Sequence, residues 1–81
     1  MNIRVRLFSI ARELANLQEL DLDMKDGEKA RDVYDYLRAY NESFMDYKAT
    51  FRLAVNDEYV DDDHTLEEGD EVALIPPVSG G

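Results

Sequence analysis

The residues with the clearest chemical potential are the last five of the chain: Pro77, Val78, Ser79, Gly80 and Gly81. Glycine has no Cβ, so this end is slim enough to enter a narrow channel and free to adopt many backbone conformations. The prolines before it favour an extended, semi-rigid approach. Such an end presents a free carboxylate that a partner enzyme could enclose and modify. A frayed glycine-rich terminus without function has the same composition, and the pattern alone favours neither interpretation.

The rest of the chain offers little for catalysis. It contains no cysteine, which excludes disulfides, a thiol nucleophile and a thiolate metal site, so sulfur carried by this protein could not be held on a cysteine. The single histidine, His64, follows three aspartates, and consecutive side chains point in different directions. We therefore expect a solvated acidic loop there, no metal site, no bound cofactor and no internal catalysis.

Length and charge restrict the possible classes of protein further. Eighty-one residues make one small domain with one modest core. The net charge is −10 at pH 7, which disfavours nucleic acid as a partner because its phosphates would be repelled. No signal peptide and no apolar run of membrane-spanning length is present, so we expect no membrane association and a cytoplasmic protein.

Alternation of apolar and polar residues predicts strands over residues 2–8, 17–24, 51–55, 58–60 and 71–75. A short helix over 10–16, capped by Ser9, is expected after the first strand. Apolar residues at helical spacing predict the main helix over 28–40. Residues 41–50 are expected to form a loop or single turn whose apolar side chains close the end of the core.

This order of elements predicts an α+β fold of the β-grasp, or ubiquitin-like, type. One main helix and a short extra helix would cover one face of a mixed sheet and leave the other face more open. A ferredoxin-like fold is the alternative, but no convincing second crossover helix follows residue 50. We expect the β-grasp domain to span residues 1–76 and residues 77–81 to form a flexible tail.

Three apolar residues stand at strand ends or on the face that the helices would not cover: Phe8, Tyr59 and Ile75. If the fold brings them together, they form a patch beside the tail at which a partner could bind. Ordinary partial burial within the fold would explain the same three residues, and the pattern leaves both interpretations open.

Three stretches resemble the small subunit of molybdopterin synthase. Residues 69–81, which end in Pro-Pro-Val-Ser-Gly-Gly, closely resemble that family's C-terminus. Residues 7–14 look like its first strand and short helix, and residues 54–60 look like its hairpin. The similarity extends over essentially the whole chain, although residues 25–50 match only in pattern.

The resemblance implies a β-grasp sulfur carrier. A ubiquitin-activating-type adenylyltransferase would use ATP to adenylate Gly81, and sulfur would then replace the adenylate to give a thiocarboxylate. The tail, with Gly80 and Gly81 leading, would insert into the large subunit of molybdopterin synthase, where the sulfur is used to build molybdopterin from a pyranopterin precursor. Phe8, Tyr59 and Ile75 would contact the partner. The family further suggests a heterotetramer of two small and two large subunits.

Three other functions remain open from the sequence. The chain could carry sulfur for the thiazole of thiamin or for tRNA thiolation, because activation of the terminal glycine is the same first step. It could be a ubiquitin-like modifier whose Gly81 is joined to a lysine of another protein. It could also be a plain binding module with an idle tail, in which case removal of the two glycines would leave its function intact.

Overall fold

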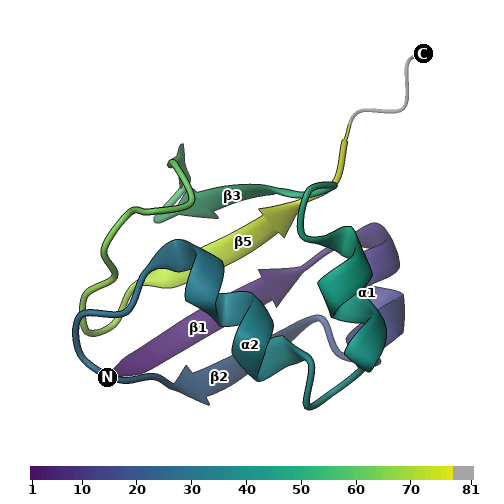
Figure 1. Cartoon of the computed structure of the whole chain (residues 1–81), viewed down its shortest axis with the longest axis horizontal. Coiled ribbons are helices and arrows are strands. Elements are labelled where there is room, and N and C mark those ends of the chain that lie inside the picture. The colour runs from purple at the N-terminus through teal and green to yellow at the C-terminus, as the bar shows by residue number, and fades with distance from the viewer. Residues whose placement is uncertain (78–81) are drawn as a thin grey trace.

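Five strands form one mixed sheet in the order β2-β1-β5-β3-β4 (Figure 1). The computed structural model describes residues 1–77. The strands are β1 (Asn2–Leu7), β2 (Glu19–Asp23), β3 (Arg52–Val55), β4 (Glu58–Tyr59) and β5 (Glu71–Ile75). β1 and β5 lie side by side and run parallel, and the other neighbouring pairs are antiparallel. All five predicted strands are confirmed, most with ends one or two residues shorter.

The alternation in the strands separates a core face from an open face. In β1, Ile3, Val5 and Leu7 are buried, whereas Arg4 and Arg6 between them are exposed. Successive side chains of a strand point to opposite faces, so a half-buried sheet requires this pattern. The helical elements cover the core face, as Figure 1 shows. They are α1 (Ser9–Ala15), the 3-10 turn η1 (Ala30–Asp32), α2 (Val33–Leu37) and the 3-10 helix η2 (Glu42–Tyr47).

The main helix is shorter than the prediction over residues 28–40. Lys29 has an extended backbone and forms a bridge with Thr65 instead of entering a helix. On either side of it, the Leu66 N–H donates to the Glu28 carbonyl at 2.9 Å, and the Ala30 N–H donates to the His64 carbonyl at 2.8 Å. The helical spacing therefore identified the buried face correctly, but pairing with a distant segment displaces the helix start.

The segment after α2 closes the end of the core, as predicted, and does so as the 3-10 helix η2. The Asn41 side chain accepts a hydrogen bond from the Ser43 N–H at 2.9 Å and so caps this helix. Phe44 is completely buried, and Met45 and Tyr47 pack against the core while partly exposed. Aromatic and thioether side chains from a short segment thus fill the space that the short α2 leaves.

The start of α1 differs from the prediction. Ser9 was expected to cap the helix with its hydroxyl, but the capping position belongs to Phe8, whose extended backbone makes no side-chain capping bond. The Phe8 carbonyl accepts the Ala11 N–H at 3.0 Å. Phe8 is therefore the residue that connects β1 to α1, and it is not the last residue of the strand. The helix ends at Ala15, and the next residue, Asn16, has the left-handed φ of 58° that often terminates helices.

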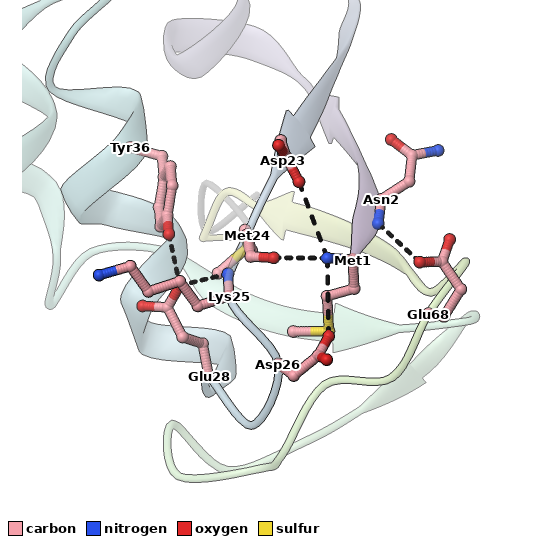
Figure 2. A network of polar contacts seen from close by, with 9 residues as sticks. All are labelled: Met1, Asn2, Asp23, Met24, Lys25, Asp26, Glu28, Tyr36 and Glu68. Carbon is pink, nitrogen blue, oxygen red and sulfur yellow. Dashed lines mark hydrogen bonds and ion pairs between the residues drawn. The ribbon is translucent and has the colours of Figure 1, made fainter.

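A polar network fastens the end of the sheet at which β1 begins (Figure 2). The ammonium group of Met1 is partly buried and donates to the Met24 carbonyl at 2.6 Å. The carboxylates of Asp23 and Asp26 each lie 3.7 Å from the same nitrogen. Because β1 and β5 are parallel, this network and the C-terminal end of β5 lie at opposite ends of the sheet. The fold is thus tied down at the end remote from the tail.

Candidate functional site: an apolar patch at the base of the tail

The strand that leads into the tail lies in the interior of the sheet. β5 pairs with β1 on one side and with β3 on the other, up to Ile75 opposite Arg52. Pro76 follows half-buried, and Pro77 is exposed. Proline has no N–H for the ladder, so the strand ends here and the chain leaves the sheet beyond the tip of β5 (Figure 1). The sheet therefore fixes the point from which the last residues of the chain depart.

Phe8, Tyr59 and Ile75 come together on the open face beside this exit. They share a depression of about 190 Å³. Its lining consists of Arg6, Phe8, Ala54, Asp57, Tyr59, Ala73 and Ile75. Four of these residues form one row across the strands, because Arg6 is opposite Ala73, Ala73 is opposite Ala54, and Ala54 is opposite Tyr59. The two alanines make a low floor between larger side chains. We call the residues that line this depression the docking patch.

The docking patch has one prominent anchor. Tyr59 is 57% exposed, more than any other large apolar side chain among residues 1–77. Phe8 and Ile75 are half-buried and rim the same depression. Aromatic side chains that project from a shallow apolar floor are frequent energetic centres of protein–protein contacts. The patch is therefore suited to bind a complementary apolar protrusion next to the tail.

Tyr59 reaches the docking patch through a tight hairpin. Asn56 and Asp57 both have left-handed backbones, with φ of 51° and 70°, as a two-residue turn of type I′ requires. The turn places Tyr59 of β4 directly opposite Ala54 of β3. The guanidinium carbon of Arg52 lies 3.8 Å from the centre of the Tyr59 ring. The position of the Tyr59 side chain is consequently fixed by the strand register and by the arginine stacked on its ring.

A second network, which the sequence did not reveal, fixes this hairpin against β5. The Asn56 amide donates to Asp70 at 2.9 Å and accepts the Glu71 N–H at 3.0 Å. The Asn56 N–H donates to the Glu71 carbonyl at 2.8 Å, and the other Asp70 oxygen accepts the Glu67 N–H at 2.8 Å. Asp70 is buried. The only signal in the sequence was an asparagine in a turn and an aspartate immediately before a strand.

The chain belongs to the ThiS family. The model of that family matches residues 5–81. A relative from Arabidopsis thaliana, named as a molybdopterin synthase sulfur carrier subunit, is 37% identical over 81 residues, covering 100% of this chain and 84% of the relative.

Solved structures agree with the fold. A putative molybdopterin converting factor, subunit 1, from Pyrococcus furiosus has a TM-score of 0.84 at 30% identity, covering 96% of this chain and 99% of that one. A complex of subunits 1 and 2 of molybdopterin-converting factor from Helicobacter pylori contains a chain with a TM-score of 0.70 at 24% identity, and each chain is covered fully. The predicted β-grasp fold and the predicted family resemblance are confirmed.

The structure places four of the site residues predicted for this ThiS-family chain. Phe8, Tyr59 and Ile75 converge in the docking patch, and Pro77 lies exposed beyond β5. Their roles in binding a partner remain predictions. The other four predicted residues lie outside the described part of the chain: Val78, Ser79, Gly80 and Gly81.

The remaining features considered in the sequence are the acidic loop with His64, a metal site and a membrane-spanning helix. His64 and the aspartates before it lie in an exposed loop, where the carbonyls of Asp62 and His64 accept the N–H groups of Arg31 and Ala30. Within residues 1–77, no three histidine, cysteine or acidic side chains are placed to hold a metal ion. In the same range, no helix has the length and hydrophobicity needed to cross a lipid bilayer.

Proposed function

We propose that this chain is a sulfur carrier for the synthesis of molybdopterin. In this function Gly81 is adenylated, converted to a thiocarboxylate and inserted into the large subunit of molybdopterin synthase, where its sulfur passes to the pyranopterin precursor. The observation that carries the proposal is the position of β5, the strand that leads into the tail, which ends at Ile75 beside the docking patch. The names and whole-chain similarity of the relatives support the choice of pathway.

The chemistry requires activation because a carboxylate is a poor acyl donor. The Gly81 carboxylate would attack the α-phosphorus of ATP, releasing pyrophosphate and giving an acyl-adenylate. A sulfur nucleophile at the oxidation level of hydrosulfide would then displace AMP and leave a thiocarboxylate. ATP would be bound by a ubiquitin-activating-type adenylyltransferase and not by this chain. The thiocarboxylate sulfur would attack the precursor, and hydrolysis of the acyl link would return the Gly81 carboxylate.

The docking patch would position the tail for both partners. A short tail can reach a buried reaction centre only if the domain behind it is held against the mouth of the channel. Contacts at Phe8, Tyr59 and Ile75 would hold the domain there and convert tail insertion into an intramolecular step with a high effective concentration. The same surface would be used in turn by the adenylyltransferase and by the large synthase subunit, so the two complexes would exclude each other.

The terminal glycine provides the direct test. We expect Gly81→Ala, or deletion of Gly81, to abolish sulfur transfer, since a Cβ would obstruct a channel built for glycine and deletion would shorten the reach. Intact-mass spectrometry after incubation with ATP, the adenylyltransferase and a sulfur donor would show one sulfur-for-oxygen exchange in the wild type and none in the variants. Lys25→Ala, changed at the opposite end of the sheet, should behave as wild type.

Two results would reject the proposal. Normal molybdopterin formation with the Gly81-deleted protein would show that the terminal carboxylate carries no sulfur. An isopeptide bond between Gly81 and lysines of other proteins, without any thiocarboxylate, would instead identify a ubiquitin-like modifier. Unchanged circular dichroism of the variants is the required control for retention of the fold.

A further inference from the structure

The open face of the sheet carries cations that are unusual for so acidic a chain. The protein has 19 acidic and 9 basic residues, yet three of the basic ones, Arg4, Arg6 and Arg52, project from this face. The first of them is neutralised by Asp21, whose carboxylate accepts a hydrogen bond from it at 3.3 Å and raises its pKa. Of the other two, Arg6 is part of the docking patch and Arg52 lies beside it.

Arg6 and Arg52 differ in how they are paired. Arg6 lies 3.5 Å from a carboxylate oxygen of Glu71 and 5.3 Å from the centre of the Phe8 ring. Arg52 stacks on Tyr59 at 3.8 Å and forms no ion pair within residues 1–77. A guanidinium stacked on a ring leaves its N–H groups directed outward in the plane of the group. Arg52 therefore presents an unoccupied fork of donors at the edge of the patch.

A partner that covers the docking patch must also cover Arg52. Its Cα pairs with that of Ile75, and its guanidinium lies on the Tyr59 ring, so it stands between two residues of the predicted contact surface. Removing a charged group from water without a counter-charge is strongly unfavourable. Tight binding at this surface thus requires the partner to supply an acceptor for the guanidinium, and a carboxylate satisfies it best because two parallel hydrogen bonds can form.

The acidic loop of this chain does not fulfil that role. Asp61 and Asp63 line two grooves together with Arg52, and Tyr59 lines one of them as well. Neither carboxylate forms an ion pair or a hydrogen bond with it. The two carboxylates attract the Arg52 guanidinium only at long range. They leave its N–H donors unoccupied at the surface that a partner would bury.

We propose that the partner surface that binds the docking patch carries a carboxylate opposite Arg52, next to an apolar protrusion that fills the depression. This inference rests on the proposed function, in which that partner is the large synthase subunit. It runs against the net charge of −10, which by itself suggests a basic partner surface. Arg52 would select the partner and fix its orientation, since the bidentate geometry allows one approach only.

Replacement of Arg52 by leucine tests the inference, because the direction of the change in affinity shows whether the partner surface is charged or apolar. If the partner supplies a carboxylate, Arg52→Leu leaves that group buried and unpaired, and we expect the dissociation constant to rise about 100-fold. Arg52→Lys keeps the charge but not the planar fork, and its affinity should lie between those of the leucine variant and the wild type. Isothermal titration calorimetry with the large synthase subunit from the same organism measures all three.

The matched control is Lys25→Leu. It removes the same charge and adds the same side chain, but at an exposed position near the network of Figure 2, at the other end of the sheet. Its dissociation constant should equal that of the wild type. Thermal unfolding of each variant shows that the fold is retained, so a loss of affinity reports the contact.

The outcomes separate the inference from the proposed function. If the wild type binds and Arg52→Leu binds equally or more tightly, the surface opposite Arg52 is apolar and the inference is wrong, while sulfur transfer can still proceed. If the wild type does not bind the large subunit at all, the proposed function fails and the inference fails with it. Loss of affinity in Arg52→Leu with partial recovery in Arg52→Lys supports both.

Discussion

At the scale of single residues, the most informative side chain in the core is Tyr34. It is 2% exposed, and its hydroxyl has no hydrogen-bond partner among residues 1–77. A buried polar group without a partner lowers stability. We expect Tyr34→Phe to keep or increase the free energy of unfolding at pH 7, by up to about 1 kcal/mol. Urea denaturation measures this, and a loss of more than about 1 kcal/mol would reveal a hydrogen bond, for example to a buried water.

The same hydroxyl predicts a stability loss in alkali. Burial, and next the negative charge of Asp62, raise the pKa of Tyr34 above its ordinary value of 10.0. Between that value and the folded-state pKa, the native state holds a proton that the unfolded state releases, so stability falls as the pH rises. Tyr34→Phe should flatten the decline above pH 10. Tyr36→Phe is the comparison, because the pKa of Tyr36 is also raised, mainly by its hydrogen bond to Glu28 (Figure 2). A decline as steep in Tyr34→Phe as in the wild type would contradict this.

At the scale of elements, the hairpin that carries Tyr59 depends on the bonds between Asn56 and Asp70. Asn56→Ala removes both side-chain bonds and leaves the buried Asp70 carboxylate with fewer donors. We expect a loss of about 1–3 kcal/mol in the free energy of unfolding. Asp57→Gly is the control in the same turn, because glycine accepts its φ of 70° without strain and should preserve stability. Equal stability of Asn56→Ala and wild type would show that the network is dispensable.

Local patterns in the sequence predicted the helices and strands. Features that depend on pairing with distant segments could not be predicted from them. Alternation along β1 identifies its buried face because burial has the same period as the strand. The predicted start of the main helix was wrong because Lys29 pairs with Thr65, 36 positions away, and local residue spacing does not indicate such a partner. Phe8, Tyr59 and Ile75 could be selected as apolar residues outside the core pattern. The stacking of Arg52 could not be foreseen, since it depends on the register of β3 with β4 and β5.

At the scale of the whole molecule, charge repulsion should make stability depend on salt. A net charge of −10 is confined to a domain with a radius of gyration of 11.7 Å. At about 0.01 M salt the Debye length is roughly 30 Å, so carboxylates across the entire domain repel one another, whereas unfolding separates them. The surface ion pairs that salt would weaken are mostly exposed and contribute little. Salt should therefore stabilise this fold.

We expect the melting temperature at pH 7 to rise between about 0.01 M and 0.15 M sodium chloride, where the Debye length shrinks to about 8 Å. Each kcal/mol of relieved repulsion raises it by about 4–8 °C in a domain of this size. Differential scanning calorimetry measures the shift. Near the isoelectric point of about 4.3 the net charge vanishes, so the rise should become much smaller there. A melting temperature that falls with salt at pH 7 would mean that attractive pairs, among them the Met1 ammonium with Asp23 and Asp26, outweigh the excess of carboxylates.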